Sequence, residues 1–126
     1  ATKVTTTITN GATEMMVNGA KVTLEAPAFL EKGKMMVPLR AVTEAFGIPS
    51  KDVVYSAGNI AIFANGRTIS LSIGSTDAFV NGAKMTLANP AKIVNERTTV
   101  PVGDLGRLLG LKVEWDNAAK TATFTN

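Results

Sequence analysis

The side chains that could do acid–base chemistry here are carboxylates, because histidine and cysteine are both absent. Two carboxylate pairs could in principle serve glycoside hydrolysis, Glu114 with Asp116 and Glu44 with Asp104. Glu114 and Asp116 flank Trp115 on one expected strand, so they point to the face opposite the indole. The two carboxylates are better explained as part of a solvent-exposed face of the strand than as a catalytic acid and base. We therefore assign no catalytic residue.

The same absence of imidazoles and thiols bears on metals and nucleophiles. Copper and zinc sites depend on His and Cys ligands, and Ser-His-Asp and Cys-His catalysis needs the same side chains. Calcium prefers oxygen ligands, and Asp77, Asp104 and Asp116 could supply them. No Asp-rich loop has the required ligand spacing, however. We expect no metal, no cofactor and no enzymatic activity.

Two aromatic residues, Tyr55 and Trp115, stand at equivalent positions in a repeat described below. An exposed pair could form a stacking platform for a wall polysaccharide. The alternative is that both are core or edge aromatics of a hairpin, where such residues are ordinarily found.

Composition narrows the class of protein. The chain has 126 residues, is 45% hydrophobic and carries a net charge of +3. Its basic residues are dispersed, which argues against nucleic-acid binding, and no apolar run approaches the roughly 18 residues of a membrane span. The first residue is Ala1 rather than Met, as expected of a mature secreted protein.

The elements that must position these residues repeat with a period of 63 residues. The segment 17–24 returns at 80–87 with one substitution, and 15 of the 44 ungapped pairs between residues 5 and 48 and their counterparts are identical. Such a repeat predicts two copies of one structural unit. The chain is therefore divided into an N-terminal strand and two repeat units: 1–13, 14–64 and 65–126.

Hairpins are expected to make up most of each unit. Asn-Gly pairs supply the positive φ angles of type I′ turns. At the end of each copy, after a short insertion in the first, 60–63 aligns with 121–124. The Asn-Gly pairs begin at Asn10, Asn18, Asn65 and Asn81.

One short helix is predicted in each copy, at 39–46 and at 102–109. Each follows a proline and ends at a glycine, as expected of helix starts and caps. Gly103 and Gly106 predict that the second helix is shorter or less regular. The fold class is α+β, mainly β: two tandem copies of a small antiparallel sheet packed on one short helix.

Two segments carry a family resemblance. Residues 36–47 read Met-Val-Pro-Leu-Arg-Ala-Val-Thr-Glu-Ala-Phe-Gly, and residues 110–116 read Gly-Leu-Lys-Val-Glu-Trp-Asp. With the Asn-Gly hairpins, they resemble the repeat of the copper amine oxidase N-terminal, or stalk, domain, once per copy over nearly the whole chain. In copy two, Gly103 and Asp104 replace the expected arginine and small residue, so the family arginine carries over to Arg40 alone.

The resemblance implies a small antiparallel sheet wrapped against a short helix, in bacterial secreted and cell-surface proteins. It implies no catalysis, because the oxidase chemistry resides in other domains. A secreted, extracellular or cell-surface location is therefore expected.

The N-terminal strand lacks a preceding partner, and the closing strand 120–125 lacks a following one. We predict that the first adds to the second in a neighbouring molecule, a head-to-tail contact that builds a filament or surface layer. The alternative is that the N-terminal strand folds back on its own C-terminal strand and closes the sheet within a monomer. The expected self-association residues are Val4, Thr6, Ile8, Thr121, Thr123 and Phe124.

Together these features predict a non-catalytic extracellular structural protein that forms a homopolymer. The competing prediction is a cell-wall polysaccharide-binding or adhesion module that acts as a monomeric stalk. The expected partners are other copies of the chain or wall polysaccharide, with no nucleic acid and no membrane insertion.

Overall fold

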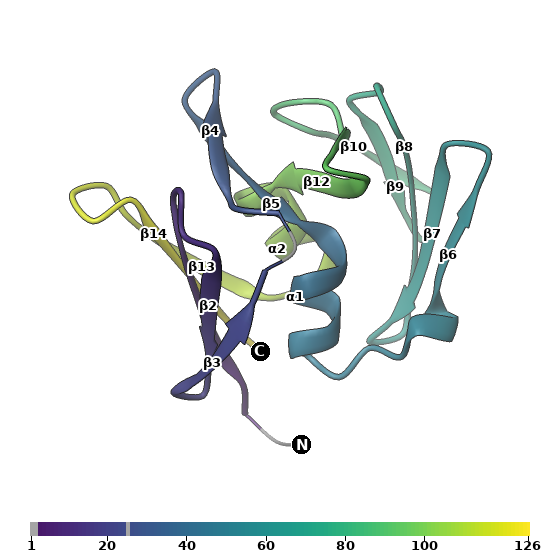
Figure 1. Ribbon diagram of the computed structural model, residues 1–126. Coiled ribbons are helices and arrows are strands. Elements are labelled where there is room, and N and C mark those ends of the chain that lie inside the picture. Colours follow the sequence, from purple (N-terminus) through teal and green to yellow (C-terminus); the bar gives the residue numbers. More distant parts are fainter. Residues whose placement is uncertain (1–2, 25) are drawn as a thin grey trace.

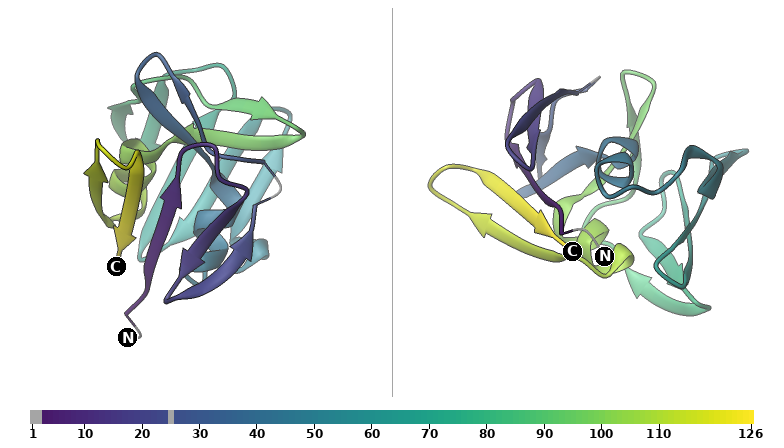
Figure 2. Two further views of the ribbon diagram at one scale, coloured as in Figure 1. Left: turned by 60° about the vertical axis from the view of Figure 1, so that its left-hand side comes forward. Right: turned by 90° about the horizontal axis from the view of Figure 1, so that it is seen from below.

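The computed structural model describes residues 3–24 and 26–126. Two five-stranded antiparallel sheets lie on opposite sides of two short helices, and a four-stranded sheet lies between them, above the helices in the view of Figure 1. Figure 2 shows the same arrangement from the side and from below. The fold is therefore α+β and mainly β, as predicted. Within the described part of the chain, no helix is both long and apolar enough to span a membrane.

The three sheets are named here by position. Sheet 1 has the order β13 (Lys112–Asp116), β14 (Thr121–Thr125), β1 (Thr5–Thr9), β2 (Glu14–Val17) and β3 (Ala20–Thr23). Sheet 2 has the order β10 (Ala83–Thr86), β9 (Asp77–Val80), β8 (Arg67–Ser72), β7 (Asn59–Ala64) and β6 (Val53–Ser56). The central sheet has the order β11 (Lys92–Val94), β12 (Arg97–Pro101), β5 (Lys34–Pro38) and β4 (Phe29–Glu31).

The two copies are related by an approximate two-fold axis through the central sheet. Strands β5 and β12 are equivalent in the repeat, and they pair antiparallel with Val37 opposite Val100, its own counterpart 63 residues on. Both valines are fully buried. Because an antiparallel pair of equivalent strands has a two-fold relation, every element flanking β5 has a matching element flanking β12.

The copies exchange their closing hairpins across this axis. The β6–β7 hairpin of copy one extends the β8–β10 strands of copy two, while the β13–β14 hairpin of copy two extends β1–β3 of copy one. Residues 14–64 and 65–126 therefore each contribute strands to both five-stranded sheets. The exchange brings the two ends of the chain to adjacent strands, β1 and β14 (Figure 2).

The helices begin where predicted, after Pro38 and Pro101. Helix α1 spans Leu39–Ala45 and α2 spans Val102–Leu109, so the second helix is one residue longer and the expectation that it would be shorter is wrong. Packing overrides the low helix propensity of glycine here, because a side chain at Gly106 would collide with Val113 of β13. Gly106 lets the helix lie close to the edge strand of sheet 1.

Three of the four Asn-Gly pairs form the predicted turns. Asn18, Asn65 and Asn81 adopt φ angles of 50°, 52° and 51°, each followed by a glycine of positive φ, between directly paired strands. The prediction at Asn10 is wrong, because residues 10–13 form a four-residue loop between β1 and β2. There, the Gly11 N–H donates to the Ala28 carbonyl instead of closing a tight turn.

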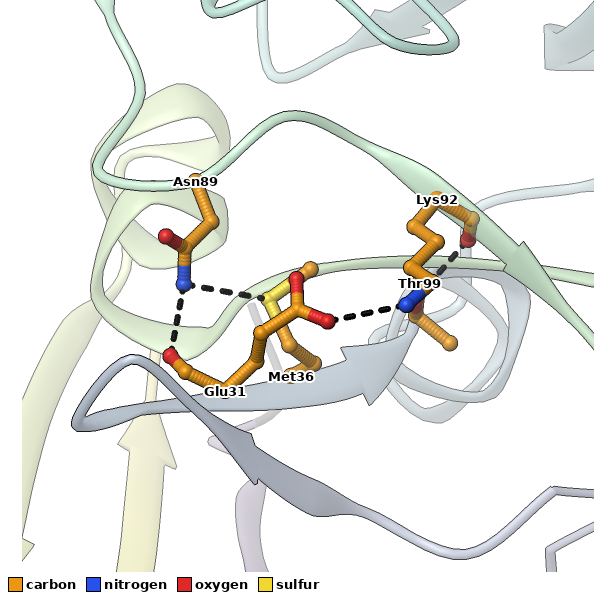
Figure 3. Close-up of polar contacts among 5 residues, drawn as sticks. All are labelled: Glu31, Met36, Asn89, Lys92 and Thr99. Atoms are coloured by element: carbon orange, nitrogen blue, oxygen red, sulfur yellow. Dashed lines mark hydrogen bonds and ion pairs between the residues drawn. The ribbon is translucent and has the colours of Figure 1, made fainter.

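A polar cluster ties the β4–β5 hairpin to copy two (Figure 3). The buried Asn89 side-chain amide donates to the Glu31 carbonyl at 2.8 Å and contacts the Met36 sulfur at 3.9 Å. Lys92 forms an ion pair with Glu31 at 2.9 Å, and the Thr99 hydroxyl donates to the Lys92 carbonyl at 2.8 Å. This cluster fixes the position of the hairpin that forms one wall of a groove described next.

Candidate functional site

The residues predicted for self-association do come together, but within one chain. Strand β1 pairs with β14 of the same molecule, with Thr6 opposite Phe124 and Thr7 opposite Thr123. Ile8 and Phe124 are both fully buried. The open edge expected along the closing strand 120–125 is thus closed in a single chain, because the exchange of hairpins places the N-terminal strand beside the C-terminal one.

We call the contact between β1 and β14 the terminal seam. The Val4 N–H donates to the Asn126 side-chain oxygen at 2.8 Å, and the Thr9 and Thr121 hydroxyls lie 2.9 Å apart. The Thr6 hydroxyl is buried and finds no hydrogen-bond partner in the part of the chain described. The seam thus contains one polar atom whose desolvation nothing compensates.

The register of the seam corrects the alignment of the closing hairpins. The β6–β7 loop has two residues, whereas the β13–β14 loop has four, residues 117–120. Because Phe124 and Ile62 lie opposite the equivalent positions Thr6 and Ile69, Phe124 corresponds to Ile62. Aligning 60–63 with 121–124 is therefore wrong by one residue.

Two grooves, related by the approximate two-fold axis, flank the helices. Groove 1, about 620 Å³ in volume, lies between helix α1, the β11–β12 hairpin of the other copy, and Tyr55 of β6. Groove 2, about 520 Å³, lies between helix α2, the β4–β5 hairpin and Trp115 of β13. Sequence reasoning missed both grooves because each takes one wall from the other copy.

Tyr55 and Trp115 occupy the equivalent positions predicted, but in different grooves, so they do not form one platform. Both lie on the edge strand of a five-stranded sheet, with 43% and 41% of their surface exposed. The Arg40 guanidinium lies 5.2 Å from the centre of the Tyr55 ring, a cation–π contact that covers one face of the tyrosine. Copy two has Gly103 in place of Arg40, and no equivalent contact to Trp115 occurs among the residues described.

Most of the carboxylates considered for catalysis or calcium binding are held by partners in the chain, and the predicted pair of Glu44 and Asp104 is divided between groove 1 and groove 2. Buried Asp104 accepts from the Ala88 N–H at 2.7 Å and pairs with Arg107. Asp116 accepts from the N–H groups that follow it in the β13–β14 loop, and exposed Glu114 pairs with Lys112. Within the described residues, no group of three or more carboxylates is arranged to hold a metal ion.

Comparison with known proteins gives a family. A model described as the copper amine oxidase N-terminal domain matches residues 1–53 and 16–124. That domain of copper amine oxidase is a non-catalytic accessory domain. No curated protein and no solved structure matches the chain.

Proposed function

Because the chain belongs to the copper amine oxidase N-terminal domain family, we propose that it is a non-catalytic structural protein, secreted or displayed at the cell surface, that assembles head to tail through strand β1. The accessory role of this domain in copper amine oxidase supports the non-catalytic part. The hydrogen bonds and ion pairs made by Asp104, Asp116 and Glu114 support it as well, since each of these carboxylates is held by a partner in the chain.

The observation on which the assembly proposal rests is the terminal seam. Strand β1 is an interior strand of sheet 1, with β14 on one side and β2 on the other, and no turn joins it to β14. All of its backbone pairs with β14 could form equally with β14 of a second molecule. Each molecule that donates β1 leaves its own slot free for the next, so the exchange is open-ended and gives a filament.

Two features make release of β1 from its own chain feasible. The unpaired buried hydroxyl of Thr6 lowers the stability of the strand in its slot. The loop 10–13 is short, and a short connection that can extend into a straight strand favours exchange between molecules.

Cysteine locking tests the proposal, because the chain has no cysteine of its own. Thr7 and Thr123 lie directly opposite each other across the seam, so a disulfide in the Thr7→Cys/Thr123→Cys variant should hold β1 in its own chain. We expect the native chain to form filaments that sediment and are visible by electron microscopy at high concentration. The locked variant should stay monomeric until it is reduced.

The equivalent pair Ala61 and Ser70, across β7 and β8, gives the matched control. A disulfide in the Ala61→Cys/Ser70→Cys variant should leave assembly unchanged. A native chain that remains monomeric at high concentration, or a locked variant that still forms filaments, would contradict the proposal. Deletion of residues 1–9 should likewise abolish filaments.

A monomeric stalk that binds cell-wall polysaccharide is the second candidate function. The observation that favours it is the half-exposed indole of Trp115 beside groove 2.

A further inference from the structure

Grooves 1 and 2 differ at several positions of the helices that line them, and one of these differences bears on the exposed aromatic ring. In groove 1, Arg40 covers a face of Tyr55. Its counterpart in groove 2 is Gly103, and a side chain begun there would meet no other atom within 4 Å. Groove 2 therefore lacks the arginine side chain that covers the aromatic ring in groove 1, and no other atom lies where such a side chain would begin.

The indole of Trp115 is held at the mouth of groove 2 by its strand register. Trp115 lies opposite Ala122, which is fully buried, so its side chain is on the inner face of sheet 1. Because β13 is an edge strand, no further strand covers that side chain. A flat apolar surface thus faces an open groove instead of packing into the core.

Charged groups line groove 2 beside this surface. Asp104 is buried and holds Arg107 by an ion pair, while 62% of the Arg107 side chain remains exposed. Lys34, on the β4–β5 hairpin, also lines the groove and forms no ion pair with a described residue. Two cations against one carboxylate give the lining a net positive charge.

The polar cluster in Figure 3 holds the β4–β5 hairpin, which carries Lys34 and forms one wall of groove 2. Asn89 and Lys92, both from copy two, hold the hairpin through the backbone and side chain of Glu31. In copy one the residue equivalent to Asn89 is Ala26, which has no side-chain donor. The Asn89 amide therefore anchors the hairpin wall of groove 2, and groove 1 has no equivalent side-chain donor at this position.

An apolar plane beside a net positive charge matches one ligand chemistry well. The C–H face of a sugar ring packs on an aromatic plane, because both are flat and apolar, while carboxylates bind Arg and Lys at the ring edge. A volume of about 520 Å³ suits a short segment of a chain. We propose that groove 2 binds an acidic oligosaccharide, with Trp115 as the stacking surface and Lys34 and Arg107 as the carboxylate-binding groups.

This inference rests on the second candidate function, polysaccharide binding, and not on filament assembly, so its test does not require a monomer. Trp115 is the single tryptophan, so its fluorescence reports directly on groove 2. The probes are tetramannuronic acid, the neutral tetrasaccharide cellotetraose, and tetraglutamate as an acidic peptide. We expect a saturable fluorescence change with tetramannuronic acid, and binding of cellotetraose and tetraglutamate weaker by about tenfold or more.

Substitution of Gly103 gives the decisive variant. Gly103→Met places a long uncharged side chain over the indole without adding a cation, and should weaken binding of tetramannuronic acid about tenfold or more. Gly103→Ala and Tyr55→Ala should bind as the native chain does, whereas Lys34→Ala should bind more weakly.

Three results would overturn the inference. The first is no saturable change with tetramannuronic acid, and the second is equal binding by the Gly103→Met variant. The third is equal affinity for tetraglutamate or cellotetraose, since the groove would then recognise charge or a peptide alone, or a sugar ring irrespective of its charge.

Discussion

Strands β1 and β8 occupy equivalent positions in the two five-stranded sheets, but they are held there differently. Strand β8 is joined to β7 by the two-residue turn Asn65-Gly66. At the terminal seam, Asn126 and Val4 meet where that turn would begin and end, with a hydrogen bond in place of a covalent link. The same pairing pattern is thus joined by a turn at one seam and only by non-covalent contacts at the other, which is the seam that the assembly proposal concerns.

The side chains reinforce this difference. The Asn65 amide and the Arg67 guanidinium both donate to carbonyls at the C-terminal end of α2, which ties the β7–β8 seam to a helix. Val4 stands where copy two has Arg67 and can make no such bond. Within sheet 1, Thr6 buries an unpaired hydroxyl where β8 buries Ile69. Two copies with one topology thus contain one firmly held strand and one weakly held strand.

The largest expected effect tests whether β1 is docked in its own chain at all. Ile8 and its counterpart Leu71 are almost completely buried, so truncation of either to alanine should destabilise the chain by about 2–5 kcal/mol. Urea denaturation at low protein concentration measures both. If Ile8→Ala lowered the free energy of unfolding by less than about 1 kcal/mol while Leu71→Ala lowered it by the full expected amount, β1 would leave its slot before global unfolding.

The second prediction concerns the two helices. Gly106 of α2 corresponds to Thr43 of α1, a fully buried side chain whose hydroxyl donates to the Arg40 carbonyl. In α2 the methyl group of Gly106→Ala would meet the stiff, β-branched Val113. We expect a loss of about 1–3 kcal/mol despite the better helix propensity of alanine.

The Gly106→Ala/Val113→Ala double variant provides the control in thermal denaturation. Removing the Val113 side-chain methyls should relieve the collision, so the double variant should lose less stability than the two single losses predict together. Simple additivity would show that the helix and strand do not approach as closely as described.

Much of the fold follows from local sequence signals. Pro38 and Pro101 mark both helix starts, and Asn18, Asn65 and Asn81 mark tight turns, because these residues fix φ angles locally. The exchange of hairpins could not be predicted from the sequence. A closing hairpin can form the same backbone hydrogen bonds with the strands of its own copy or with those of the other copy. The turn at Asn95-Glu96, where Glu96 has a φ of 64°, also has no strong sequence signal.

The candidate sites were also predictable only in part, because some of their residues are brought together by long-range pairing. Tyr55 and Trp115 stand out as aromatics at one repeat position, and the predicted seam residues do meet across β1 and β14. Lys34 belongs to groove 2 only because β5 pairs with β12, which places a hairpin of one copy beside the helix of the other. A long-range pairing of this kind leaves no local pattern in the sequence.

The third prediction reverses the usual sign of a core substitution. Thr6→Val replaces a buried unpaired hydroxyl with a methyl group of similar size, so it should stabilise the chain by about 1 kcal/mol. Thr99→Val is the matched control, because the equally buried Thr99 hydroxyl donates to the Lys92 carbonyl and its loss should destabilise. By holding β1 more firmly, Thr6→Val should also slow filament formation. Destabilisation by Thr6→Val in urea denaturation would show that its hydroxyl is satisfied.

The smallest expected effect separates the two glycines of α2. An added methyl at Gly103 meets no atom within 4 Å, whereas one at Gly106 meets Val113. Gly103→Ala should therefore gain stability by up to about 1 kcal/mol, because alanine restricts the unfolded chain and favours the helix. Thermal denaturation of Gly103→Ala and Gly106→Ala in parallel measures both effects, and the two variants should shift the melting temperature in opposite directions. A loss at Gly103 comparable to that at Gly106 would mean that groove 2 is closed by a neighbouring segment, and the open space beside Trp115 would then not exist.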